Sequence, residues 1–165
     1  MEKSLEEIKL ALTQPPLLGC PSKNGKFILD TDASNNAIGA VLSQMNDDGK
    51  EVVIYYASNR LSKCERMYCT TRKELLAVVH YLKVFRHYLI GKKFVLRTDH
   101  KSLTWLQSWK NPSSSQYFYW INQLSEFEFE IVHRKGAEHS NADALSRPID
   151  CKQRSLGRTN EILEI

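Results

Sequence analysis

The chain has 165 residues, of which 42% are hydrophobic and 25% are charged, and its formal net charge is +4. This length and apolar content are typical of one globular domain with a single core, and an aromatic content of 10% argues against a disordered chain. The sequence has no apolar run of about 18 residues and no signal-like start, so we expect neither a membrane partner nor a secreted protein.

Alternating residues and short apolar runs predict strands in the first part of the chain. A short amphipathic leader over 1–22 ends in a proline-rich break. Strands are then predicted at 26–32, 37–44 and 51–57, with the turn sequence Asn-Asp-Asp-Gly at 46–49 between the last two. These three strands predict an antiparallel meander.

The apolar period changes from two residues to about 3.6 in the middle of the chain, which predicts one long amphipathic helix over 65–88 that ends before Gly91. The remaining elements follow in chain order: a strand at 93–99, helices at 102–109 and 116–126, a strand at 128–134 and a terminal helix at 140–147. Helices that alternate with strands after a meander predict an α/β domain in which helices cover a mixed sheet.

Acidic side chains occur where several of these elements would meet. Asp32 and Asp99 end the first and fourth predicted strands, so adjacency of those strands would bring both carboxylates to one edge. Glu74 lies at the border of the apolar stripe of the long helix, and Asp143 lies between small residues of the last helix. Carboxylates from separate elements suit Mg²⁺, but each acid alone also fits a cap, a turn or a solvated position.

Six sequence blocks, taken together, resemble the ribonuclease H domain of gypsy-type LTR retrotransposon Pol polyproteins, within the reverse transcriptase. The blocks are FILDTDAS (27–34), AIGAVLSQ (37–44), TRKELLAV (71–78), FRHYLIG (85–91), LRTDHKSL (96–103) and NADALSR (141–147). The resemblance implies a ribonuclease H-like α/β fold, with a five-stranded mixed sheet made of the meander and two further strands, flanked by helices.

The resemblance also implies how the chain is divided. Residues 1–22 resemble the end of the polymerase or connection region of a reverse transcriptase. Residues 23–148 would form the ribonuclease H-like domain, and 149–165 would be a linker or tail that leads toward an integrase.

By its motifs, the resemblance places four catalytic and metal-binding acids at Asp32, Glu74, Asp99 and Asp143. Asp30 shares a strand face with Asp32, so the choice of Asp32 rests on the motif alone. The implied cofactors are two Mg²⁺ ions, with Mn²⁺ as a possible substitute and no small-molecule cofactor. The implied activity is two-metal-ion hydrolysis of the RNA strand of RNA–DNA hybrids during reverse transcription.

Further residues are candidates by position. Relatives often have a mobile histidine shortly before the last aspartate that assists product release. His139 lies four residues before Asp143, which is closer than in the usual pattern, and a loop or helix N-terminal histidine without that role is the alternative. Residues near the helix start and the acidic motifs are candidates for nucleic-acid contact: Ser34, Thr70, Thr71, Arg72, Lys101 and Ser102.

Two rival functions stay open. The domain is either an active endoribonuclease or a catalytically weak or inactive module that binds nucleic acid or protein. Such a module could belong to a mobile element or be retained by a host. The four cysteines form no Cys-x-x-Cys pair, so we expect reduced thiols and an intracellular protein, in cytoplasmic virus-like particles or in the nucleus.

Overall fold

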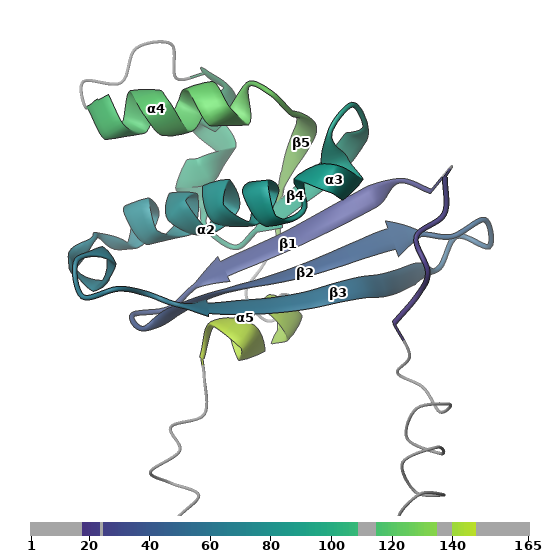
Figure 1. Ribbon diagram of the computed structural model, residues 1–165, viewed down its shortest axis with the longest axis horizontal. Coiled ribbons are helices and arrows are strands. Elements are labelled where there is room, and N and C mark those ends of the chain that lie inside the picture. The colour runs from purple at the N-terminus through teal and green to yellow at the C-terminus, as the bar shows by residue number, and fades with distance from the viewer. Residues whose placement is uncertain (1–17, 24, 109–114, 135–139, 148–165) are drawn as a thin grey trace, which may run out of the picture.

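A five-stranded mixed sheet forms the centre of the protein (Figure 1). The computed structural model describes residues 18–23, 25–108, 115–134 and 140–147. The strands lie side by side in the order β3-β2-β1-β4-β5, which confirms the predicted meander with two further strands. Their bounds are β1 Phe27–Ala33, β2 Ala37–Met45, β3 Glu51–Arg60, β4 Lys93–Thr98 and β5 Glu128–His133.

Helices cover both faces of this sheet. In Figure 1, α2, α3 and α4 lie on one side and α5 lies on the other. The helical elements are η1 Glu65–Met67, α2 Thr70–Val84, α3 Arg86–Leu89, η2 Lys101–Ser108, α4 Ser115–Leu124 and α5 Ser140–Ser146. Within the described part of the chain, none of these helices has the length and apolarity needed to cross a bilayer.

The register of the sheet decides which side chains meet at its edge. β1 pairs antiparallel with β2, and Asp32 lies opposite Gly39. β1 pairs parallel with β4, and Leu29 lies opposite Leu96. Because parallel neighbours end at the same edge, the residues that follow the ends of β1 and β4 lie close together, as the sequence predicted.

The main core lies between the sheet and α2. Phe27 and Leu29 point from β1 into this core and are fully buried, together with Val78 and Leu82 of α2. The hydroxyl of Tyr81 is also buried and donates a 2.8 Å hydrogen bond to the backbone carbonyl of Ile38 on β2. Because the hydrogen bond satisfies the phenol, the polar group fits an otherwise apolar interface.

The prediction of one long helix over 65–88 is wrong: the segment forms three separate helical elements, η1, α2 and α3. Tyr68 and Cys69 adopt extended backbone between η1 and α2, so the regular helix begins only at Thr70. At the other end Phe85 has φ −95° and ψ 14°, which separates α2 from α3. Phe85 and Leu89 are both buried, and their apolar spacing stays in phase across the break. Periodicity therefore shows no interruption, whereas the backbone has one.

Part of the predicted leader contacts the domain. The backbone N–H of Gly19 donates to the carbonyl of Val53 on β3 at 2.7 Å, and the side-chain amide of Gln44 bonds to the carbonyls of Ser22 and Gly25 at 2.8 and 2.7 Å. Residues 1–17 and the tail at 149–165 lie outside the described residues, so the division into leader, domain and tail stays a prediction.

Candidate metal centre

Three acids from separate elements converge at the edge of the sheet. Asp32 lies near the end of β1, Glu74 in the second turn of α2, and Asp99 directly after β4. One carboxylate oxygen from each lies within 4.8 Å of the others. Such a set of hard oxygen donors suits a divalent cation such as Mg²⁺.

Asp30 lies two residues before Asp32 on the same strand face but has different partners. Its carboxylate forms ion pairs with Arg97 (3.6 Å) and Arg134 (4.0 Å) from β4 and the residue after β5. It is therefore neutralised by cations, whereas Asp32 joins the acidic group. The two aspartates therefore differ in their surroundings, and the assignment of Asp32 as a metal ligand stays a prediction.

Glu74 is buried in a strongly acidic environment. Burial, followed by the negative charges of Asp32 and Asp99, raises the pKa of Glu74 from 4.5 to about 9, although a backbone hydrogen bond from Ala33 acts in the opposite direction. One of its oxygens, Oε2, is buried and has no hydrogen-bond partner among the described residues. An unpaired buried oxygen costs free energy unless a proton or a cation satisfies it, so these residues fit a bound divalent metal.

We expect the free energy of unfolding of the metal-free protein to fall as the pH rises from about 4.5 to 9. The fall should be smaller for Glu74→Gln. The folded pKa of Glu74 lies above the unfolded value, so folding takes up a proton in this window and the stability contribution falls with pH. The slope from one such group is at most about 1.4 kcal/mol per pH unit. Urea unfolding with a chelator at pH 5, 7 and 9 measures the difference.

Asp47→Asn is the control, because Asp47 is exposed in the β2–β3 turn. It should follow the wild-type pH dependence. Equal slopes for Glu74→Gln and the wild type would contradict the inferred protonation of Glu74.

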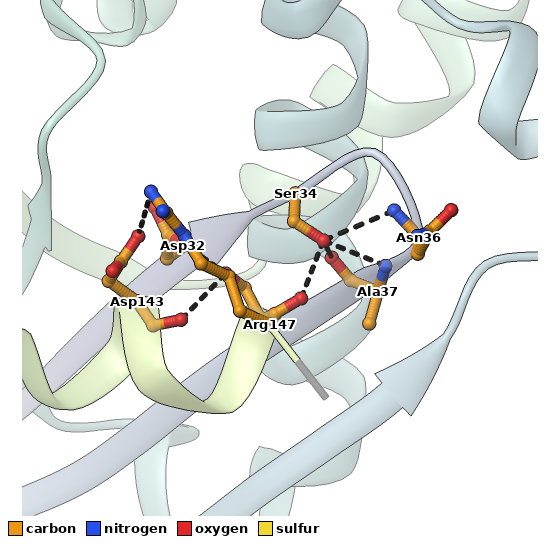
Figure 2. Close-up of polar contacts among 7 residues, drawn as sticks. Asp32, Ser34, Asn36, Ala37, Asp143 and Arg147 are labelled. Carbon is orange, nitrogen blue, oxygen red and sulfur yellow. Dashed lines mark hydrogen bonds and ion pairs between the residues drawn. The ribbon is translucent and has the colours of Figure 1, made fainter. Parts of the chain in front are cut away.

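Asp143 reaches the same cleft from the opposite face of the sheet (Figure 2). Its carboxylate forms a 2.7 Å ion pair with Arg147, one helical turn later. A hydrogen bond links α5 to the acidic group: the hydroxyl of Ser146 donates to Oδ2 of Asp32. Asp143 is not a member of the 4.8 Å group, so it lies beside the cluster rather than within it.

The acids line a cleft of about 540 Å³. Its surface combines carboxylates with hydroxyl, amide and cationic groups, which together suit a polar, charged ligand. The lining residues are Asp32, Ala33, Ser34, Asn35, Asn36, Thr70, Lys73, Glu74, Asp99, His100, Asp143 and Arg147.

Ser34 lines the cleft, but its hydroxyl already has internal partners (Figure 2). The oxygen accepts the backbone N–H groups of Asn36 and Ala37 at 3.1 and 3.0 Å, and the hydroxyl lies 2.5 Å from the carbonyl of Ser146, to which it donates. Ser34 therefore shapes the β1–β2 turn and ties it to α5. Its contact with nucleic acid stays a prediction.

The candidates at the start of α2 divide into two groups. Thr70 lines the cleft, and the hydroxyl of Thr71 is 2.9 Å from Nε2 of His100, which also lines it. The guanidinium of Arg72 instead lies 3.9 Å from the ring centre of Tyr68, in a cation–π contact, and it is not part of the cleft lining. The position of Arg72 favours packing of the helix start over substrate contact.

The other predicted contacts lie farther out or outside the described residues. Lys101 and Ser102 are exposed at the start of η2 and do not line the cleft. His139 lies outside the described residues, so its role in product release stays a prediction.

Sequence reasoning missed several residues that line the cleft: Asn35, Asn36, Lys73, His100 and Arg147. It also missed Ser146, which donates to Asp32. The i, i+4 spacing of Asp143 and Arg147 is a readable signal for an ion pair. Nothing in the sequence marks Lys73 as buried, because a lysine in a first helical turn is normally solvated.

The fold and the site together define an α/β domain of the ribonuclease H type with an acidic cleft. Residues 22–127 match the family described as the RNase H-like domain found in reverse transcriptase. The chain belongs to this family, which confirms the resemblance seen in the sequence.

The relatives are retrotransposon polyproteins. The chain is 43% identical over 145 residues to a retrovirus-related Pol polyprotein from transposon 297 of Drosophila melanogaster, and 39% identical over 151 residues to the Tf2-3 transposon polyprotein of Schizosaccharomyces pombe. These alignments cover 88% and 90% of the chain but only 13% and 11% of the two polyproteins, so the chain spans about an eighth of the curated relatives it matches.

Solved structures share the fold at low sequence identity. A foamy viral protease-reverse transcriptase in complex with dsDNA has a TM-score of 0.61 and 19% identity, over 82% of this chain and 29% of that one. RNase H1 of Halobacterium salinarum has a TM-score of 0.52 and 16% identity, over 73% of this chain and 92% of that one. These similarities confirm the ribonuclease H-like fold.

Proposed function

We propose that this domain is a metal-dependent endoribonuclease that cleaves the RNA strand of RNA–DNA hybrids during retrotransposon reverse transcription. The observation that carries the proposal is the convergence of Asp32, Glu74 and Asp99, with a buried Glu74 oxygen that has no partner among the described residues. A structural role alone would not require three carboxylates within 4.8 Å, since like charges at this distance oppose folding.

The residues of this cleft would hold two Mg²⁺ ions, or Mn²⁺ in their place. Such ions, when bound, activate water and stabilise the attacking and leaving oxygens of a phosphoryl-transfer reaction. Asp32 is the central ligand in this proposal, because it lies between Glu74 and Asp99 on one side and α5 on the other. Ser146 orients Asp32 by donating to its Oδ2.

Asp143 completes the proposed ligand set by turning away from Arg147. Their ion pair is exposed, with 39% of the Asp143 side chain and 72% of the Arg147 side chain accessible to solvent. Exposed pairs contribute at most about 1 kcal/mol, so binding of a cation can readily compete with Arg147 for this carboxylate.

The substrate assignment rests on the family and on related structures. Similar solved structures include a foamy viral protease-reverse transcriptase and an RNase H1, each in complex with an RNA/DNA hybrid. The relatives are transposon polyproteins, which supports a polyprotein context. We propose that polymerase sequences precede this domain there and that an integrase follows it. In that context the protein would act inside the cell, in virus-like particles or in the nucleus.

The test is cleavage of an RNA–DNA hybrid labelled on either strand. We expect Mg²⁺-dependent cutting of the RNA strand, no cutting of the DNA strand, and no cutting of double-stranded DNA or double-stranded RNA. A chelator should abolish the activity. Folded protein that binds the hybrid without cutting it in Mg²⁺ or Mn²⁺ would refute the proposal and favour a binding module.

A further inference from the structure

Lys73 is a buried cation in the wall of the acidic cleft. It lies in the first turn of α2, directly before Glu74, and only 6% of its surface is exposed. Its ammonium donates a 3.0 Å hydrogen bond to the side-chain oxygen of Asn35 in the β1–β2 turn. Both residues line the cleft, so this contact spans two elements of its wall.

The partner of Lys73 is unusual for a buried charge. An ammonium has three donors, and a neutral amide accepts one of them. No carboxylate among the described residues forms an ion pair with Lys73, although Asp32, Glu74 and Asp99 line the same cleft. The other cation of the cleft, Arg147, is paired with Asp143 at 2.7 Å. Burial of a cation that is not paired with a carboxylate is costly, which favours a role that needs the charge.

The surroundings of Lys73 suit an anion. The side-chain amides of Asn35 and Asn36 and the hydroxyl of Thr70 line the same wall. The N-terminus of α2 also lies at this wall, and Cys69 provides no side-chain cap for its first backbone N–H groups. Neutral donors, a helix N-terminus and an ammonium together are the groups that bind phosphate.

We propose that Lys73, held by Asn35, binds a backbone phosphate of the nucleic-acid duplex next to the acidic cluster. This inference rests on the proposed function, because it places a nucleic acid in the cleft. The ammonium offsets the repulsion between the phosphate and the nearby carboxylates, and Asn35 fixes its position on the cleft wall. Lys73 is thus a substrate-positioning residue on the β1–β2 side of the cleft.

The test measures binding separately from cleavage. Affinity for a labelled RNA–DNA hybrid is measured by fluorescence anisotropy in Mg²⁺, at several salt concentrations, on an Asp32→Asn background that should not cut. Adding Lys73→Met should raise Kd about tenfold, the typical loss for a hydrogen bond to a charged group. It should also reduce the slope of log affinity against log salt by about 0.9, the value for one phosphate contact.

Matched variants distinguish a phosphate contact from a structural effect. Lys73→Arg should retain most of the affinity and the salt slope. Lys50→Met removes the same charge from an exposed residue in the β2–β3 turn, at the other end of the sheet from the β1–β2 turn, and it should leave the slope unchanged. Asn35→Ala alters an exposed turn residue, so it can be tested even if Lys73→Met does not fold. It should raise Kd, by less than Lys73→Met does.

The inference is overturned if Lys73→Met binds the hybrid with unchanged Kd and salt slope, or if Asn35→Ala binds as the parent does when Lys73→Met is unfolded. Absence of measurable binding by the Asp32→Asn parent also overturns it, since Lys73 then supplies no affinity. The proposed function is judged independently, by RNA cleavage with Asp32 intact.

Discussion

Asp32→Asn is expected to reduce RNA-strand cleavage more than about 100-fold while the protein stays folded. Loss of an outer-shell partner of a metal ligand typically costs about 10–100-fold, and Asp32 is the proposed central ligand, so its loss should cost more. Removing one charge from the acidic group also relieves repulsion with Glu74 and Asp99. We therefore expect the melting temperature without metal to be unchanged or higher, measured by thermal denaturation beside the cleavage assay.

Asp30→Asn provides the matched control, because it makes the same change two residues earlier on the same strand face. Asp30 is buried and paired with Arg97 and Arg134, so its loss leaves two cations without this partner. We expect a lower melting temperature, and cleavage within about tenfold of wild type at a temperature where the variant is folded. Equal loss of activity in both variants would contradict the distinction between a metal-binding and a structural aspartate.

Gly39→Ala is expected to reduce both stability and cleavage, because Gly39 lets α5 approach the sheet. A Cβ atom at this position would lie 2.6 Å from the backbone nitrogen of Ser146 and 2.7 Å from the carbonyl oxygen of Ala142. Both contacts are backbone atoms of α5, so the helix must shift. Overpacking of this kind typically costs about 1–3 kcal/mol. The shift also displaces Asp143 and the Ser146 contact to Asp32, so the rate should fall even at temperatures where the variant is folded.

Gly49→Ala is a glycine control with a different cause of destabilisation. Gly49 has φ 74°, a left-handed conformation that costs a side-chain-bearing residue about 1–2 kcal/mol, and no atom lies within 4 Å of the position of an added Cβ. Denaturant unfolding should therefore show comparable losses of stability for the two variants. Cleavage should fall only for Gly39→Ala. Normal cleavage by folded Gly39→Ala would show that the position of α5 does not limit catalysis.

Much of the fold was predictable because its signals are local. Alternation and short apolar runs placed all five strands to within a few residues. The runs arise because β1 and β2 are buried on both faces. The break at Phe85 and the extended Tyr68–Cys69 segment were not predictable in this way. Apolar residues continue in phase through the break because the residues before and after it pack into the same core.

The local sequence pattern cannot distinguish Asp30 from Asp32. Both acids share one strand face, and both are buried to a similar extent, at 5% exposed. Only their neighbours differ, and these come from β4, α2 and the residue after β5, which are distant in sequence. The family motif selects Asp32 as the metal ligand, which stays a prediction. The structure shows that Asp30 is engaged in ion pairs with Arg97 and Arg134.

The sequence by itself determined the family and the order of the main strands and helices, because motifs and periodicity are local properties of the chain. It also singled out four acids as candidate ligands, which stays a prediction. Only the tertiary structure decided that Glu74 is buried with a pKa of about 9, that Lys73 is held by Asn35 in the cleft wall, and that Asp143 lies beside the cluster, paired with Arg147. Burial and charge compensation depend on what the rest of the chain places around a side chain, and no local pattern encodes that environment.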